Sequence, residues 1–238
     1  MKAVIVFLLI IGATLSAQTS KVVRKINLDA KGLTLMRIEN GSGELDIIGR
    51  KDINQIEAEL VFELPERMSE KEADEYIDDH VRIESGTRGG RGLLVTENRG
   101  RWNWNWNEGL RMRVTVYMPG GIDLDVHDNS GSMSIRDIDG NLDVEDGSGS
   151  LSISDISGNV RVEDGSGSLD IFRIGGNLKV DDGSGSLTIE DVRESVTVDD
   201  GSGSVRIRNV GGDVVILNEG SGSLSIHDVK GRVENHDD

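Results

Sequence analysis

The chain has 238 residues, a formal net charge of −17 and no cysteine. Such an acidic surface argues against a nucleic-acid partner, because phosphate binding needs basic side chains. The lack of cysteine excludes disulfides, thiol catalysis and thiolate zinc sites. Only 36% of the residues are hydrophobic and 3% aromatic, so the chain is either partly disordered or packed in thin layers.

Residues 1–17 have the pattern of a secretory signal peptide. Lys2 precedes an apolar run at residues 3–11, and small residues lead to a cleavage site that we expect after Ala17. The run is shorter than the roughly 20 residues that span a bilayer, and no later stretch is long and apolar enough. We therefore expect export, with no transmembrane segment left after cleavage, in the periplasm or at the cell surface.

Residues 18–127 are expected to form a β-rich cap that includes a first coil of the repeat found further along. Alternation of apolar and polar residues predicts strands at residues 56–62 and 110–118. Between them, Ser69 and Glu72 form a capping box that predicts a short helix. One face of this helix is lined by Ala73, Tyr76, Ile77 and His80. We expect this half to cover the first coil and protect its edge.

All three tryptophans of the chain alternate with asparagine directly after Arg101, as Trp102, Trp104 and Trp106. In a strand their rings would share one side. Exposed, they would form a stacking platform for sugar rings or a strip at a membrane interface; buried, they would plug the end of the repeat array. These four residues are the candidate ligand-binding site, and both interpretations stay open.

Residues 128–238 repeat themselves every 18 residues. The same block starts at Asp146, Asp164, Asp182 and Asp200, and once more, after one extra residue, at Glu219. Repetition at a fixed period predicts a solenoid, in which each repeat buries its apolar face only against its neighbours.

Each repeat is predicted to contain two short strands. Leu151 and Ile153 alternate with polar residues, as do Val160 and Val162, and glycine-containing turns separate the two pairs. A helical repeat conflicts with this period and with the glycine content. An antiparallel meander also suits the turns, but the strict register favours a parallel β-solenoid (β-helix) with five inward apolar side chains per coil.

Acidic pairs recur at one point of the coil, at residues 145–146, 163–164, 181–182 and 199–200. Stacked carboxylates repel each other, and bound Ca²⁺ would relieve the repulsion. The favoured interpretation is an exposed turn in which Asp caps backbone amides and one member of each pair points to solvent. In the Ca²⁺-binding nonapeptide pattern an Asp stands where this chain has Leu151, which disfavours that mechanism.

A second row lies nine residues further on, with members Asp137, Asp155, Arg173, Asp191, Asn209 and Asp228. Arg173 would stand between two aspartates of adjacent coils, which suggests charge relief inside a structural turn. A catalytic site would break the repeat at one place, and neither row does so.

The remaining residue types predict no catalytic, cofactor-binding or metal site. His80, His127, His227 and His236 are scattered and lack metal-ligand spacing. No serine differs from its repeat equivalents as a nucleophile would, and the Gly-Ser-Gly turns lack the lysine of a phosphate loop.

Four features together resemble one bacterial family. They are the recurring Asp-Gly-Ser-Gly-Ser-Leu-x-Ile block, an early copy at residues 38–45, the strand end at residues 116–119 and the export signal. The chain is similar, from about Arg37 to Val233, to the putative adhesin family of exported β-solenoid proteins (DUF4097). This resemblance implies an envelope protein with an adhesive role and carries no catalytic residues over.

The sequence thus predicts an all-β protein with a signal peptide (1–17), a cap region containing one short helix (18–127) and β-solenoid repeats (128–238). The predicted function is a non-enzymatic binding or structural module of the bacterial cell envelope, with envelope glycans or proteins as partners. Two alternatives are a polysaccharide-active β-helix enzyme and a scaffold dependent on divalent cations such as Ca²⁺.

Overall fold

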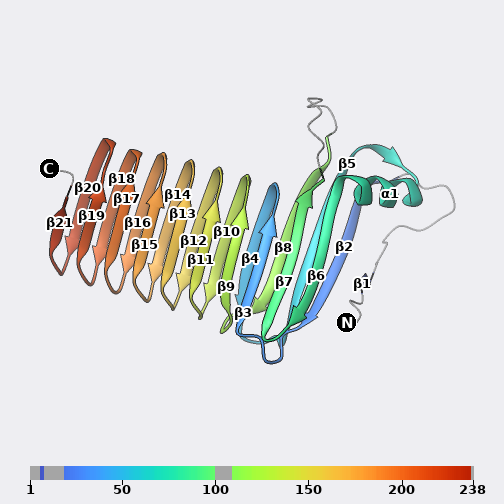
Figure 1. Cartoon of the computed structure of the whole chain (residues 1–238), viewed down its shortest axis with the longest axis horizontal. Coiled ribbons are helices and arrows are strands. Elements are labelled where there is room, and N and C mark those ends of the chain that lie inside the picture. The colour runs from blue at the N-terminus through green and yellow to red at the C-terminus, as the bar shows by residue number, and fades with distance from the viewer. Residues whose placement is uncertain (1–5, 8–18, 100–108, 237–238) are drawn as a thin grey trace.

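The computed structural model describes residues 6–7, 19–99 and 109–236 as a parallel β-solenoid of about six regular coils that extends from a capped N-terminal end (Figure 1). Two sheets, of eleven and ten strands in the described part of the chain, face each other across a thin core. Each coil contributes one strand to each sheet. Of the predicted signal peptide, only Val6–Phe7 lies within the described residues.

The first sheet, sheet A, has the spatial order β1-β2-β5-β8-β4-β10-β12-β14-β16-β18-β20. Its strands are β1 (Val6–Phe7), β2 (Thr19–Asp29), β4 (Gly43–Arg50), β5 (Gln55–Met68), β8 (Arg111–Pro119), β10 (Gly131–Ile138), β12 (Gly149–Ile156), β14 (Gly167–Ile174), β16 (Gly185–Val192), β18 (Ser202–Val210) and β20 (Ser221–Val229).

The second sheet, sheet B, has the order β21-β19-β17-β15-β13-β11-β9-β3-β7-β6. Its strands are β3 (Leu35–Asn40), β6 (Val81–Arg88), β7 (Arg91–Asn98), β9 (Asp123–Asp128), β11 (Leu142–Asp146), β13 (Val160–Asp164), β15 (Leu178–Asp182), β17 (Val196–Asp200), β19 (Val214–Asn218) and β21 (Val233–Asn235).

The 18-residue period becomes the register of the stack. Leu151 of β12 pairs with Leu169 of β14, and Val162 of β13 with Val180 of β15, in parallel ladders. The five apolar residues predicted to point inward are all buried in each regular coil, for example Leu151, Ile153, Ile156, Val160 and Val162. The parallel pairing confirms the solenoid, and the antiparallel meander is wrong for the repeats.

Antiparallel strands close the N-terminal end. In sheet A, β5 pairs antiparallel with both β2 and β8, and in sheet B, β6 pairs antiparallel with β7. The predicted helix is α1 (Glu70–His80), and its capping box forms as expected: Ser69 Oγ accepts from the Glu72 backbone N–H, while Glu72 accepts from Ser69 N–H. The helix buries Ala73 and Ile77 at the end of the core, so the cap covers this end of the stack.

The C-terminal end is less buried. The extra residue before the last repeat shifts the register between β17 and β19, where Asp199 lies opposite Asn218. Leu224 and Ile226 of β20 are only partly buried, whereas Val205 and Ile207, their neighbours in β18, are 3% and 0% exposed. No helix in the described ranges combines the length and hydrophobicity needed to cross a membrane.

Candidate binding surfaces

Two rows of turns run along the solenoid, one on each side of the sandwich. The turns that lead from sheet B to sheet A contain the Asp-Gly-Ser-Gly sequence, for example residues 146–149, and we call their row the acidic edge. The turns that lead back contain residues such as 156–160, and we call their row the amide edge.

On the acidic edge, the second carboxylate of each pair points into the protein. This inner column comprises Asp128, Asp146, Asp164, Asp182 and Asp200, which are 3%, 5%, 4%, 1% and 1% exposed. Consecutive members are in register on consecutive strands of sheet B. The prediction of an exposed turn is therefore wrong for these residues, since the alternation of the strand places them on the same side as Leu142 and Val144.

The inner aspartates lack hydrogen-bond partners for at least one oxygen each, and Asp200 lacks them for both. The Ser184 backbone N–H donates to Asp182 Oδ1 at 3.1 Å, which confirms that Asp caps turn amides at this position. A buried, unpaired carboxylate oxygen is costly.

Burial raises the pKa of every carboxyl in the inner column. The pKa of Asp128 rises to about 6 and that of Asp182 to about 6, while that of Asp146, which stands between two other aspartates, rises to about 7. The pKa values of Asp164 and Asp200 are raised for the same reason. Desolvation is the main cause, and neighbouring carboxylates add to it at Asp146 and Asp182.

Two neutral residues stand at the N-terminal head of the inner column. Asn40 of β3 pairs with Asp128 on one side and with Thr96 of β7 on the other. The Thr96 hydroxyl donates to Asn40 Oδ1 at 2.8 Å, and Asn40 Nδ2 donates to Asp128 Oδ1 at 2.8 Å. The early Asn40-Gly-Ser-Gly copy was the signal for this head, but its role appears only once the coils are stacked.

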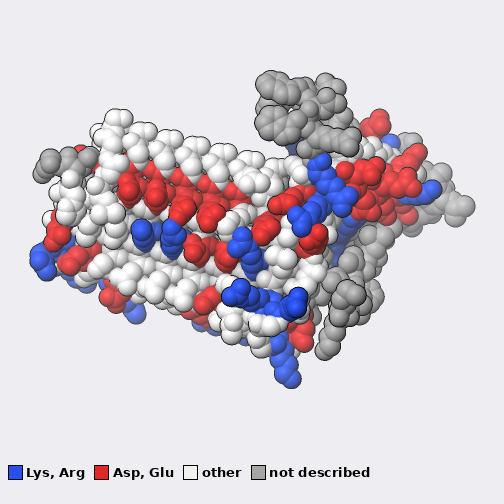
Figure 2. Space-filling view, viewed as in Figure 1, with Lys and Arg blue, Asp and Glu red and all other residues white. Residues whose placement is uncertain are grey.

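The first carboxylate of each pair points outward and forms an outer row. Glu145, Glu163, Asp181 and Asp199 are in register on successive strands of sheet B and are partly or fully exposed. Figure 2 shows acidic side chains in a row along the stack, with Lys and Arg beside it. The solvent-facing half of the predicted turn is confirmed by these residues.

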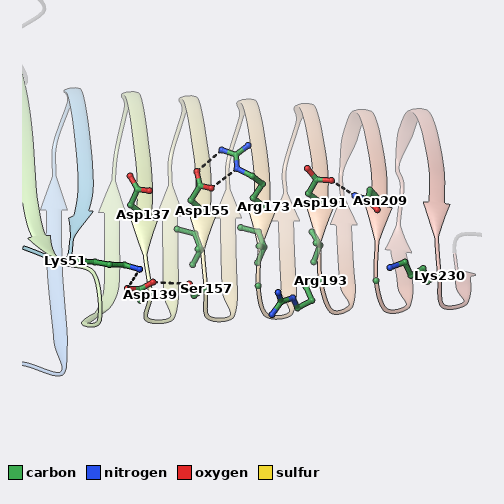
Figure 3. A pocket seen from close by; sticks show the side chains of 15 residues that line it. Lys51, Asp137, Asp139, Asp155, Ser157, Arg173, Asp191, Arg193, Asn209 and Lys230 are labelled. Atoms are coloured by element: carbon green, nitrogen blue, oxygen red, sulfur yellow. Dashed lines mark hydrogen bonds and ion pairs between the residues drawn. The ribbon is translucent and has the colours of Figure 1, made fainter.

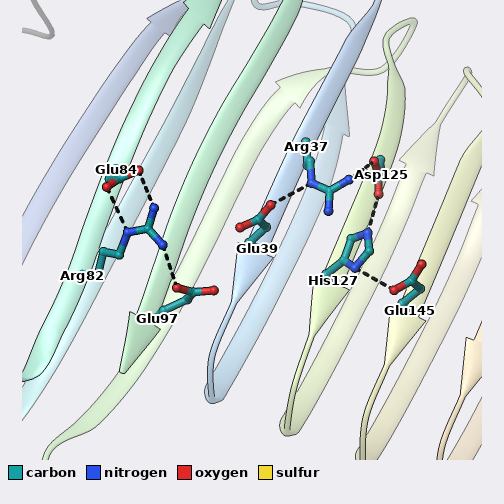
Figure 4. A network of polar contacts seen from close by, with 8 residues as sticks. All are labelled: Arg37, Glu39, Arg82, Glu84, Glu97, Asp125, His127 and Glu145. Atoms are coloured by element: carbon teal, nitrogen blue, oxygen red, sulfur yellow. Dashed lines mark hydrogen bonds and ion pairs between the residues drawn. The ribbon is translucent and has the colours of Figure 1, made fainter. Parts of the chain in front are cut away.

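Ion pairs extend the outer row toward the N-terminal end (Figure 4). His127 lies between two carboxylates, with Nδ1 2.8 Å from Glu145 Oε2 and Nε2 3.1 Å from Asp125 Oδ1. Arg37 pairs with Asp125 and Glu39, and its bond to Glu39 contributes most to the rise of the Arg37 pKa. These carboxylates near the cap therefore have side-chain partners, in contrast to the inner column.

The tryptophan segment lies between β7 and β8, and Arg101, Trp102, Trp104 and Trp106 all fall outside the described residues. Its described flanks are fixed: Asn98 Nδ2 donates to Ser42 Oγ at 2.6 Å, and Arg99 N–H donates to His80 O at 2.7 Å. A hollow of about 480 Å³ beside these flanks is lined by Ser42, Glu44, Glu63, Asn98, Arg111 and Arg113, among others.

Strand register shows what the segment replaces. Thr96 is opposite Asn40, and Arg113 is opposite Glu44. Only residues 41–43 separate Asn40 from Glu44, whereas residues 97–112 separate Thr96 from Arg113. The connection that contains the tryptophan segment therefore joins strands that the neighbouring coil joins by a tight turn, and its described ends lie on the acidic edge, next to the head of the inner column.

The amide edge is hydrogen-bonded from coil to coil. Asn141, Asn159 and Asn177 each offer a side-chain oxygen to the backbone N–H of the equivalent residue one coil further, at distances of 2.9 to 3.3 Å. Asp123 begins this ladder and Asp213 ends it, through Ser195. The ladder was not predicted from the sequence, although Asn recurs after Gly in the predicted turns.

The second predicted row lies on the same edge, and its members from Asp137 to Asn209 line a shallow groove of about 700 Å³ (Figure 3). All six members are left-handed, with φ between 56° and 63°, a conformation that Asp and Asn tolerate better than most residues. Arg173 makes a bidentate pair with Asp155, 2.7 Å for each bond, which lowers the Asp155 pKa. Charge relief within a structural turn is thus confirmed at Arg173.

The chemistry open to the two edges follows from how their carboxylates are arranged. Within residues 6–7, 19–99 and 109–236, no group of three or more His, Asp and Glu side chains is arranged to hold a metal ion. The carboxylates of both edges instead form rows with one member per coil. This arrangement can bind protons, cations in a diffuse manner, or hydroxyl groups of an elongated ligand.

Comparison with known proteins identifies the chain at the level of a family. The Toastrack DUF4097 family model matches residues 69–235, and no curated protein matches the chain. Similar solved structures include a "putative cell adhesion protein" from Clostridium sporogenes (11% identity, TM-score 0.39, covering 90% of this chain and 98% of that one). Another is a "putative adhesin" from Bacteroides fragilis (12% identity, TM-score 0.39, covering 90% of this chain and 96% of that one). A third is a "putative lipid binding protein" from Parabacteroides distasonis (11% identity, TM-score 0.34, covering 90% of this chain and 96% of that one).

Proposed function

Because the chain belongs to the Toastrack DUF4097 family, we propose that it is an exported, non-enzymatic, adhesin-like binding module of the bacterial cell envelope. In this proposal the solenoid is a rigid support, and the tryptophan segment on the acidic edge contacts the ligand. Envelope glycans are the ligand class that suits it best, because sugar rings stack on aromatic side chains and their hydroxyls bond to carboxylates and amides.

One observation carries the proposal: the tryptophan segment replaces a tight turn in a stack whose other turns are short and repeated. Residues 97–112 stand where the next coil has only residues 41–43. The register of the flanking strands stays intact around this long connection, and loops on rigid scaffolds are where binding residues concentrate. The hollow beside Asn98 and Arg111 offers polar groups next to the segment.

The two alternative functions have less support. A polysaccharide-active enzyme needs carboxylates at one place in a cleft, whereas the carboxylates of the two edges form rows with one member per coil. A divalent-cation scaffold needs clustered oxygen ligands, and the described residues show no such cluster.

The test is binding of purified mature protein to envelope glycans and to proteins from envelope fractions. We expect that replacing Trp102, Trp104 and Trp106 by Ala weakens glycan binding at least about tenfold, since aromatic anchors dominate such contacts. The matched control replaces Asn103, Asn105 and Asn107 by Ala in the same segment. Unchanged binding by the folded tryptophan variant would refute the site, and turnover of a polysaccharide would refute the non-enzymatic proposal.

Export is tested separately. In the native host we expect the protein in the periplasmic or surface fraction, with Gln18 as its first residue after cleavage behind Ala17. Mass spectrometry of the purified protein gives the N-terminus directly. A cytosolic protein that retains residues 1–17 would contradict this part of the proposal.

A further inference from the structure

The inner column is the most unusual feature of the described core. Five aspartates, none more than 5% exposed, stand on successive coils, which are about 4.8 Å apart in a parallel sheet. Every one of them has a buried carboxylate oxygen without a partner. A ligand that supplies hydrogen-bond donors or positive charge along this line would satisfy them all.

The side chains around the inner column supply neither the missing hydrogen-bond donors nor positive charge. On their own strands, the neighbours Glu145, Glu163, Asp181 and Asp199 point to the outer face and are acidic themselves, and His127 is held between Asp125 and Glu145. The following strands of sheet A begin their inward face with the buried apolar residues Met133, Leu151, Leu169, Leu187 and Val205. The turns between contribute only backbone N–H groups, such as that of Ser184.

The head of the column shows how the same position is satisfied when donors are present. Thr96 donates to Asn40, and Asn40 donates to Asp128. From Asp128 onward the residues are all acids, so the relay ends for lack of a hydrogen. A proton on a carboxyl would restore it, because a protonated carboxyl donates one hydrogen bond and still accepts others.

We propose that the inner column is a proton-binding site, in which carboxyls of successive coils share protons through O–H···O hydrogen bonds that continue the Thr96–Asn40 relay. No covalent step is involved: the protons come from water as the pH falls and return to it as the pH rises. Bound protons tie neighbouring coils together at mildly acidic pH, and their loss leaves adjacent buried carboxylates that repel each other. The acidic edge is therefore a pH-responsive seam along the solenoid.

The direction of the pH effect follows from proton linkage. In the unfolded chain an Asp has a pKa of about 3.9, whereas the folded column holds its protons to higher pH, with pKa values of about 6 at Asp182 and about 7 at Asp146. At pH values between the unfolded pKa of about 3.9 and the folded pKa values of about 6 to 7, the folded state thus binds more protons than the unfolded state. The stabilising contribution is fully present below about pH 4 and is lost as the pH rises through about 6 to 7.

Adjacent residues provide a matched pair of variants. The inner variant is D164N/D182N/D200N, which places the amide found at Asn40 in three column positions. The outer variant is E163Q/D181N/D199N, which removes the same number of charges one residue away, on the exposed face. We expect the wild-type melting temperature to fall by at least about 5 °C between pH 5 and pH 8. The inner variant should flatten this slope and melt above wild type at pH 8, while the outer variant should keep the slope.

Opposite results would overturn the proposal. The proposal fails if the wild-type melting temperature stays constant or rises between pH 5 and pH 8. It also fails if the inner and outer variants change the pH dependence of the melting temperature equally, because net charge would then explain the effect. If Ca²⁺, Na⁺ or K⁺ raises the wild-type melting temperature at pH 8, and the inner variant abolishes that response, a cation is the occupant instead of the proton.

A second measurement keeps the proposal testable if the inner variant does not fold. Infrared or NMR titration of the wild-type protein detects protonated carboxyl groups directly. We expect protonated Asp to remain at pH 6, and the same signal in the outer variant. Complete ionisation of every Asp at pH 6 would refute the shared protons.

Discussion

The two edges of the solenoid meet the same geometric demand with different chemistry. Both place one polar side chain per coil in a row with the same spacing. On the amide edge, Asn159 offers an oxygen to the next coil and, through Nδ2, a donor to the coil before it. On the acidic edge, Asp164 has a buried oxygen without a hydrogen-bond partner.

The difference shows that stacking identical residues is favourable only where the side chain has both a donor and an acceptor. Asparagine has both at every pH, whereas aspartate gains a donor only when it is protonated. One edge therefore joins the coils at every pH, and the other makes their stability depend on pH.

The largest expected effect concerns the glycines of the two edges. Gly167 on the acidic edge has φ +141°, and a Cβ there would lie 1.7 Å from the Gly149 carbonyl oxygen, so Gly167→Ala should cost at least about 4 kcal/mol or prevent folding. On the amide edge, Gly121 stands in the turn between β8 and β9, and a Cβ there would meet no atom within 4 Å. Gly121→Ala should therefore cost about 1 kcal/mol or less, and urea unfolding of both variants measures the contrast. Similar losses would show that the close approach at Gly167 does not constrain the coil.

The next largest effect is expected when an acidic residue replaces Asn40 in the neutral head of the inner column. Asn40→Asp removes the donor to Asp128 and adds a sixth buried carboxyl, so we expect a loss of about 2–3 kcal/mol at pH 8. The loss should shrink at pH 5, where the introduced carboxyl is protonated and again supplies a donor. Urea unfolding at both pH values measures this, with Asn40→Ala as the control that removes the donor without adding a charge. A loss that does not depend on pH would contradict the proton-binding column.

Breaking the amide edge should have a smaller effect. Asn159→Ala removes the acceptor for the Asn177 backbone N–H, which now lies 2.9 Å from Asn159 Oδ1. Because the position is exposed and water replaces part of the bond, we expect a loss of about 1 kcal/mol, equal at pH 5 and pH 8. Unfolding curves that diverge with pH would show that the amide edge also couples to protons.

The smallest effect is expected at Arg173. Arg173→Asn removes the exposed pair with Asp155 but places a residue in the left-handed position that tolerates it better, as Asn209 does in another coil. The two changes oppose each other, so the melting temperature should shift by less than about 2 °C. A shift several times larger would mean that the ion pair is a major link between coils.

Much of the fold could be predicted because the sequence repeats the same pattern of residues in every coil. The 18-residue repeat predicted the parallel register, the five inward apolar positions and the two rows of turns, and Ser69 with Glu72 predicted α1. These features depend on local alternation and on near-identity between neighbouring coils, so one sequence suffices to find them.

The candidate site was predicted less completely, for physical reasons. Strand alternation through Leu142 and Val144 points Asp146 inward, but the frequent use of Asp to cap the amides of turns favoured an exposed turn. The burial is tolerated because a proton can replace the missing partner. The location of the tryptophan segment on the acidic edge depends on the pairing of Thr96 with Asn40, and β7 carries no copy of the repeat motif to reveal it. The ligand-binding role of Trp102, Trp104, Trp106 and Arg101 stays a prediction.

The regular register of the coils has a consequence for how such a chain can grow. Since each coil contacts only its neighbours, duplication of one 18-residue block would lengthen the rod by about 4.8 Å and introduce no new kind of contact. Each added block would also bring one more inward aspartate. Rod length and tolerance of alkaline conditions are therefore linked: a longer descendant of this protein would need either a more acidic habitat or an asparagine in the added coil.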